Sequence, residues 1–138
     1  MRRAVVLGGG SLQADAALGA LAAAGFDAVA AGGAAELRGH VEIGATVVVL
    51  GSAGGGLDAA AAAALATLPA ALRRGCAVLV VGPGLVTGDG LRAFLLGVDL
   101  VVATADAARI GELAASAVGV KRVLVAPLDP AAAGRLGG

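Results

Sequence analysis

Residues 46–52, with the sequence TVVVLGS, constrain the fold of this chain more than any other stretch. Residues 47–50 form an unbroken apolar run without alternation of polar and apolar side chains. A strand with one solvated face would alternate, so the run predicts a strand covered on both faces, as in a parallel sheet between two layers of helices. Because the run is short and is bounded by Gly44 and Gly51, it predicts a strand and not a buried helix.

Similar apolar runs recur along the chain and alternate with segments of helical periodicity. The predicted strands are residues 3–7, 26–31, 46–52, 76–81 and 98–103, and the predicted helices are residues 12–24, 34–41, 59–74, 89–96 and 106–118. Ser11, Asp58, Asp89 and Asp106 stand where four of these helices would be capped, and Pro69 interrupts the third helix. The alternation predicts one flavodoxin-like, doubly wound α/β domain with five parallel strands and helices on both faces.

Spacing and glycines predict the faces and ends of the later helices. In the fourth predicted helix, Leu91, Phe94 and Leu95 recur at helical spacing and are predicted to face inward. Gly119 is predicted to close the fifth helix.

The C-terminal part is less determined by the sequence. Residues 122–126 fit either a sixth strand, ended by Pro127, or a continuation of the helix before them. Residues 128–138 contain little that a core would bury, so they are predicted to form a frayed tail. The predicted organisation is therefore a single domain over residues 1–127 followed by this tail.

Composition narrows the classes of function. The formal net charge is +0, from ten basic and ten acidic side chains, and a nucleic-acid surface needs a basic excess, so no nucleic-acid partner is expected. Mean hydropathy is +0.94, but no uncharged run reaches the roughly 18 residues that span a bilayer, so no membrane partner is expected. Cys76 is the only cysteine. It excludes an internal disulfide and fits a reducing, cytoplasmic compartment.

Glycine-rich segments follow the first, third and fourth predicted strands. Glycine at a strand-to-helix turn lets a phosphate approach the N-terminus of the helix. The residues that a nucleotide or another small molecule would use are Gly8, Gly9, Gly10, Ser11, Gly82 and Gly84. However, Gln13 stands where the dinucleotide fingerprint requires its third glycine, and no Walker lysine is present. Tight turns account better for these glycines, so no cofactor is predicted and the small-molecule site is kept as an alternative.

Residues for catalysis or metal binding are scarce. His40 is the only histidine, and Cys76 begins a buried strand without a histidine near it in the sequence. Ser11 and Ser52 follow strands, but neither stands in a nucleophile elbow. A metal site needs several ligands at suitable spacing, and no such set is visible. We therefore expect no catalytic residue, no metal site and no enzymatic activity.

The order of elements and the sequence LRAFLLGVDLVVAT at residues 91–104 resemble the receiver domain of two-component response regulators. The shared pattern is a helix that ends in glycine, then Gly-Val-Asp, then an apolar strand. The resemblance covers residues 3–118 and implies a role in signal transduction through contacts with other proteins.

The residues by which receivers are phosphorylated are missing here. Receivers bind Mg²⁺ with an acidic pair after the first strand, where this chain has glycines at residues 8–10. Their phosphoacceptor aspartate corresponds to Leu50 or Gly51, their Ser or Thr after the fourth strand to Gly82, and their lysine after the fifth to Thr104. Phosphoryl transfer needs a carboxylate acceptor and a cation. The resemblance therefore implies a pseudo-receiver that is not phosphorylated at the usual position.

Receivers often dock through the face built from their fourth helix, fifth strand and fifth helix. Carried over to this sequence, that face contains Arg92, Leu96, Arg109 and Glu112. The predicted function is a non-catalytic signalling or scaffolding module whose partner is another protein or a second copy of the chain. The alternatives are a small-molecule or nucleotide-binding domain that uses the glycines, and an enzyme completed by residues from another domain or chain.

Overall fold

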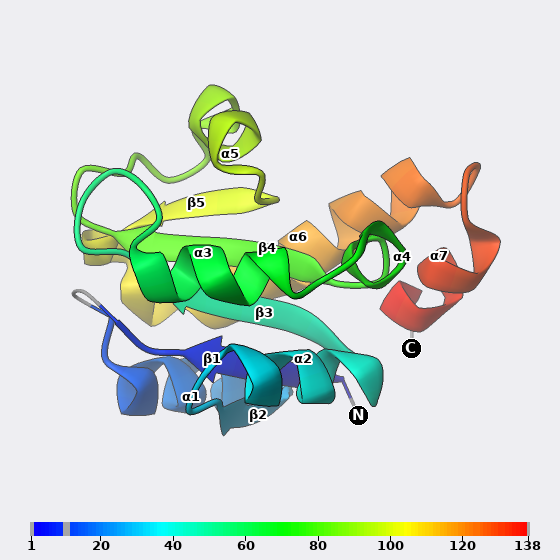
Figure 1. The fold of residues 1–138 in the computed structure, drawn as a ribbon, viewed down its shortest axis with the longest axis horizontal. Helices are drawn as coiled ribbons and strands as arrows, with labels where there is room; N and C mark the ends of the chain where they lie inside the picture. Colours follow the sequence, from blue (N-terminus) through cyan, green and yellow to red (C-terminus); the bar gives the residue numbers. More distant parts are fainter. Residues whose placement is uncertain (1, 10–11, 138) are drawn as a thin grey trace.

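The computed structural model describes residues 2–9 and 12–137, and these form a sheet between two layers of helices (Figure 1). The strands are β1 (Arg3–Leu7), β2 (Asp27–Ala30), β3 (Ala45–Gly51), β4 (Ala77–Gly82) and β5 (Leu100–Ala103). All are parallel, in the order β2-β1-β3-β4-β5. β3 lies at the centre, and each of its residues is buried. The predicted flavodoxin-like, doubly wound fold is confirmed, as is the central place of residues 46–52.

Helices cover both faces of the sheet. They are α1 (Ala14–Ala23), α2 (Ala34–Glu42), α3 (Ala59–Ala66), α4 (Ala70–Arg73), α5 (Gly90–Leu96), the 3-10 helix η1 (Thr104–Arg109), α6 (Ile110–Val125) and α7 (Pro130–Gly137). Val47 and Val49 of β3 pack with α1, α6 and α7, whereas Val48 and Leu50 pack with α2, α3 and α5. Successive residues thus enter two different cores, which explains why the run is apolar without alternation.

Two of the predicted helix caps form as expected. The side chain of Asp58 accepts a hydrogen bond from the Ala61 amide at 2.9 Å, and the side chain of Asp89 accepts one from the Arg92 amide at 3.1 Å. Asp106 differs, because it lies within η1 and does not cap α6. The remaining predicted cap, Ser11, lies outside the described residues.

Pro69 divides the alanine-rich helix, as predicted. α3 ends at Ala66 and α4 begins at Ala70, so the helix breaks into two pieces. Among the described residues, no helix has both the length and the apolar character needed to cross a membrane.

The C-terminal part corrects two sequence-based expectations. α6 continues through Gly119 to Val125, so the helix continuation is confirmed over the sixth strand as the alternative for residues 122–125, and Gly119 does not end the helix, contrary to the prediction. A glycine inside a helix costs about 1 kcal/mol relative to alanine. Burial of Val118 and Val125 against the core offsets that cost.

Residues 130–137 form α7 where a frayed tail was predicted. Ala132, Ala133 and Leu136 are buried against the core beside α6. Asp129 caps α7 by accepting a hydrogen bond from the Ala132 amide at 3.0 Å, and its carboxylate pairs with Arg74 at 2.9 Å. The hydrogen bond from Arg74 lowers the pKa of Asp129 from its ordinary value. The tail was misjudged because small alanine side chains bury well where two helices approach closely.

Candidate functional site

Doubly wound sheets usually bind ligands at the carboxyl ends of their strands, where neighbouring strands connect to opposite sides. In this sheet that point lies between β1 and β3. A Cβ atom on Gly51, at the end of β3, would overlap the carbonyl oxygen of Gly9 and lie 2.8 Å from the Cβ of Leu12. The loop after β1 therefore rests directly on the end of β3, and the backbones leave no space between them for a side chain.

The next pair of strand ends is closed in the same way. A Cβ atom on Gly82 would lie 2.8 Å from both the Cβ and the carbonyl oxygen of Ser52. Beyond it, Gly84 has a positive φ of 76° and approaches Gly55, and Arg92 donates a hydrogen bond to the Gly55 carbonyl at 3.1 Å. These glycines allow adjacent loops to pack tightly.

The glycines named for a small-molecule site thus lie together but in close-packed turns. Gly9, Gly82 and Gly84 contact neighbouring backbone or side chains, and Gly8 is exposed beside the start of α1. Gly10 and Ser11 lie outside the described residues.

Open space at this edge is found instead between α1 and η1. A groove of about 340 Å³ lies there. Its lining is mostly apolar and consists of Leu12, Gln13, Ala16, Ala17, Ala20, Val81, Thr104, Ala107 and Ala108. Alanines on both helices leave this hollow because their side chains are too short to fill it.

Of the residues considered for catalysis, the described ones, Cys76, Ser52 and His40, lie on or beside different elements, and Ser11 is outside the described residues. Burial raises the pKa of the Cys76 thiol to about 11, so the sulfur is a protonated thiol at neutral pH. The Ser52 hydroxyl donates to the carbonyl of Gly54 at 2.9 Å and thereby holds a turn. His40 lies on α2, with its Nε2 4.0 Å from a Glu36 carboxylate oxygen. Within residues 2–9 and 12–137, no three His, Cys, Asp or Glu side chains are grouped to hold a metal ion.

The largest departure from the sequence-based expectations is the orientation of α5. Leu91, Phe94 and Leu95 were predicted to face inward, but they are 70%, 81% and 67% exposed. Ala93 is the residue that α5 buries, and Leu96 is partly buried against the same core. Because α5 packs through these residues, its large apolar face points to solvent, and the helix projects above β5 (Figure 1).

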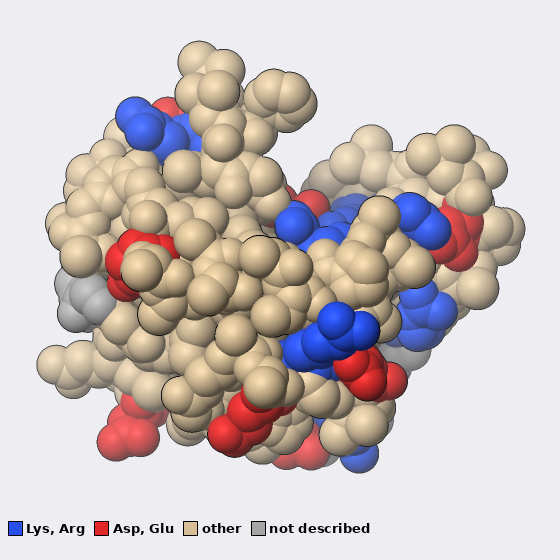
Figure 2. Space-filling view, viewed as in Figure 1, with Lys and Arg blue, Asp and Glu red and all other residues tan. Residues whose placement is uncertain are grey.

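A hollow of about 220 Å³ lies between β5 and α6. Its lining is Asp99, Leu100, Leu113, Ser116, Ala117, Val120, Lys121 and Leu124. In the space-filling view the surface is indented between α5 and the end of α6 (Figure 2). Val120 and Leu124 are largely exposed along its side. We call the surface formed by Leu91, Phe94 and Leu95 of α5, this hollow, and Val120 and Leu124 of α6 the interaction face.

An ion pair lies in the hollow. The Lys121 ammonium is 2.9 Å from a carboxylate oxygen of Asp99, and the same oxygen accepts a hydrogen bond from the Val78 amide at 2.7 Å. The Asp99 carboxylate is thereby fixed at the start of β5, and the apolar lining surrounds a polar group that is already paired.

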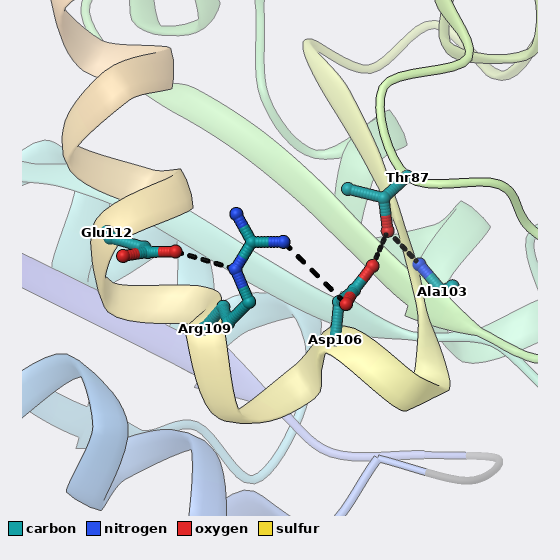
Figure 3. Close-up of polar contacts among 5 residues, drawn as sticks. All are labelled: Thr87, Ala103, Asp106, Arg109 and Glu112. Carbon is teal, nitrogen blue, oxygen red and sulfur yellow. Dashed lines mark hydrogen bonds and ion pairs between the residues drawn. The ribbon is translucent and has the colours of Figure 1, made fainter.

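A polar network borders the interaction face where β5 ends (Figure 3). The Thr87 hydroxyl donates to Asp106 at 2.6 Å and accepts from the Ala103 amide at 2.8 Å. The Arg109 guanidinium lies 3.7 Å from Asp106 and donates to Glu112 at 2.6 Å. The hydrogen bond to Glu112 raises the pKa of Arg109 above its ordinary value. The network ties the loop before α5 to η1 and the start of α6.

The four residues predicted for a docking face have different surroundings. Arg92 is exposed on α5, and Arg109 at the end of η1 and Glu112 at the start of α6 are exposed and paired with each other. Leu96 is partly buried in the core and presents little surface. Sequence reasoning missed Leu91, Phe94 and Leu95, although the small Ala93 on the opposite side of the helix was a signal for which side packs closely.

Fold and surface together define a flavodoxin-like α/β domain in which several large apolar side chains are exposed on α5 and α6. Comparison of the chain with models of protein families, with curated proteins and with solved structures finds no match. A fold of this kind hosts many unrelated functions, so the function is argued from the surface itself.

Proposed function

We propose that this protein is a non-catalytic signalling or scaffolding module, a pseudo-receiver, whose interaction face packs against a second copy of the chain. The observation that carries the proposal is the exposure of Leu91, Phe94 and Leu95 beside an apolar hollow. Soluble monomers rarely expose a contiguous apolar patch unless it binds something.

The size of the interaction face fits a dimer. Its five exposed side chains would bury roughly 100 Å² each, or about 500 Å² per copy. With the partly buried lining of the hollow, this reaches roughly 600 Å² per copy, the lower end for a specific interface.

The charges at the border of the face suit pairing with a copy of itself. Arg92 and Arg109 contribute positive charge and Glu112 negative charge. In a two-fold interface each surface meets its own copy, so a face that carries both signs can complement itself. A partner of one strong charge would instead fit a border of the opposite sign.

The strand ends support a non-catalytic role. Where a receiver carries its phosphoacceptor aspartate, Gly51 lies closed beneath Gly9. Gly82, at the end of β4, packs just as closely on Ser52. Neither position offers a carboxylate or a cation to a phosphoryl group.

Sedimentation velocity over a range of concentrations tests the proposal. The unaltered chain should shift from monomer to dimer as concentration rises, whereas a Phe94→Asp/Leu95→Asp variant should remain monomeric. Ile43→Asp, an exposed apolar position outside the face, is the control and should dimerise like the unaltered chain. A chain that stays monomeric at several hundred micromolar (on the order of the weakest specific dimers), or a double variant that dimerises normally, would contradict the proposal.

A small-molecule or nucleotide-binding domain is the second candidate, favoured by the groove between α1 and η1. Its volume lies within the range of ligand sites. Thermal-shift measurements with ATP, NAD, NADP and FMN test it. A ligand at about a hundred times its dissociation constant should raise the melting temperature by several degrees. If a shift is found, Ala16→Leu, which fills the groove, should abolish it.

A further inference from the structure

A second exposed surface lies at the opposite end of α6 from η1. The end of α6, the turn at residues 126–129 and α7 form a projection beyond the sheet (Figure 1), which we call the arm. The arm is anchored by the Arg74–Asp129 ion pair and by buried Ala132 and Leu136. Its outer surface is therefore held in place rather than free to fold onto the core.

The arm exposes large apolar side chains where the chain turns. Val123 is 73% exposed and Leu128 is 83% exposed, and Leu124 lies between them in the sequence. Neither Val123 nor Leu128 lines the hollow of the interaction face. Both belong to the projecting part of the chain near the turn between α6 and α7.

Positive charge gathers around the arm and the adjoining α4. The cations are Arg73, Arg74, Lys121, Arg122 and Arg135, and the carboxylates paired with two of them are Asp129 and Asp99. This leaves an excess of three positive charges in a chain whose formal net charge is +0. Figure 2 shows Lys and Arg grouped over α4 and the neighbouring parts of α6 and α7.

Two of these cations are particularly available. Arg122 and Arg135 are exposed, and neither forms an ion pair with a side-chain carboxylate of the described residues. The Arg135 guanidinium lies beside Gly75, and the Arg122 guanidinium lies beside Gly137. Both are thus held near the arm, on the elements that carry its apolar tip.

From this combination we propose, in departure from the sequence-based expectation of no membrane partner, that the arm binds the surface of a membrane that contains anionic lipids without spanning it. Cations attract the anionic headgroups, while exposed apolar side chains enter the boundary between headgroups and acyl chains. Exposed apolar side chains and the cations Arg122 and Arg135 on one projecting arm match a flat, negatively charged surface, whereas a protein partner would need a recess to receive the arm. The arm shares the end of α6 with the interaction face, but Arg122, Val123, Leu128 and Arg135, which carry this inference, do not belong to that face.

Co-sedimentation with lipid vesicles tests this inference. The full chain should bind vesicles of phosphatidylcholine mixed with phosphatidylserine, should bind those of phosphatidylcholine alone far less, and should lose binding as salt is raised. Arg122→Gln/Arg135→Gln should weaken binding roughly 25-fold, at about fivefold per cation. Val123→Ser/Leu128→Ser should weaken it at least tenfold, since less apolar surface enters the membrane.

A control variant tests whether the cations must lie on the arm. Arg3→Gln/Arg38→Gln removes two cations on β1 and α2, outside both the arm and the interaction face, and should leave binding within about twofold, because these side chains lie outside the surface that meets the membrane. Circular dichroism confirms that each variant is folded. Equal binding to both kinds of vesicle, no binding to either, or unchanged binding by both arm variants would overturn the inference. So would polyglutamate that binds the arm as tightly as the vesicles do, since this would assign the cations to an acidic protein.

Discussion

The carboxyl edge of the sheet and the interaction face use side-chain size in opposite ways. At the carboxyl edge, where folds of this kind usually bind ligands, Gly51 and Gly82 lie too close to the adjoining loops to carry any side chain. On α5, Leu91 and Phe94 extend into solvent beside a hollow. Glycine-rich strand ends therefore do not by themselves make a ligand site. In this chain the surface available to a partner lies on the helix α5.

The same contrast shows where each region contributes to stability. Close packing at the carboxyl edge favours folding, because each loop supports the next. The exposed residues of α5 contribute little to folding while they remain in water, and the free energy of their burial is available only to a binding event. Substitutions at the carboxyl edge should therefore lower stability, whereas substitutions on the exposed side of α5 should lower association.

Gly51→Ala should cause the largest change at the carboxyl edge. The added methyl group would overlap the Gly9 carbonyl oxygen and crowd Leu12, so we expect a loss of about 3 kcal/mol in the free energy of unfolding. Urea denaturation measures the loss. Gly19→Ala is the matched control, since nothing lies within 4 Å of its added Cβ in the middle of α1. It should stabilise the chain by about 0.5–1 kcal/mol. An unchanged midpoint for Gly51→Ala would show that the edge is open enough to admit a ligand.

The pKa of the Cys76 thiol reports whether water reaches the start of β4, the strand that ends in Gly82 at the carboxyl edge. Burial raises the pKa of its thiol from 9.0 to about 11, so the folded state keeps the proton while the unfolded state loses it. The contribution of Cys76 to the free energy of unfolding is therefore complete below pH 9. It declines as pH rises from 9 to 11, by about 2–3 kcal/mol in total. Chemical denaturation across this range measures the decline, and Cys76→Ala should remove this part of it. An identical pH dependence in the variant would show that water reaches the sulfur.

Much of the fold was predictable because it follows from patterns among residues that are close in the sequence. The continuous apolar run at residues 47–50 predicted the doubly covered central strand, and Asp58 and Asp89 predicted two helix caps. Pro69 predicted the break between α3 and α4. Each of these features depends on residues close in the sequence, so spacing and residue type sufficed.

The errors came from features that depend on packing between distant segments. Spacing showed that Leu91, Phe94 and Leu95 share one face of α5, but which face turns toward the protein is set by the fit of Ala93 against the sheet. α7 was taken for a tail because its alanines do not form a stripe of large apolar side chains, and their burial depends on the close approach of α6.

The candidate site was less predictable than the fold for the same reason. The contact between Gly9 and Gly51 depends on the register of β1 against β3, which no local pattern records. The sequence showed glycines near both positions and left open whether they form tight turns or a ligand site. Their closure over one another, and the groove beside α1, follow only from the assembled sheet.

Two of the capping aspartates lie in the two regions, one in each. Asp58 lies at the carboxyl edge, where its carboxylate would be 3.4 Å from a Cβ on Gly9, whereas Asp89 caps the exposed α5. Asp58→Ala should cost about 1–2 kcal/mol and Asp89→Ala about 0.5–1 kcal/mol, within the range of lost helix caps. Thermal unfolding of both variants measures the difference. A larger loss for Asp89→Ala would mean that α5 is more firmly integrated than its exposure indicates.

Phe94→Ser should have the smallest effect on stability and the clearest effect on association. Because the ring is 81% exposed, its removal should change the free energy of unfolding of the monomer by less than about 0.5 kcal/mol. Urea denaturation at low micromolar concentration measures this value, and sedimentation velocity at high concentration measures dimer formation. If the ring is held in water for a partner, the variant loses association while keeping its stability. A loss above about 1 kcal/mol at low concentration would mean that Phe94 packs within the monomer. In that event α5 would lie closer to the sheet, and Phe94, like the carboxyl edge, would not be available to a partner.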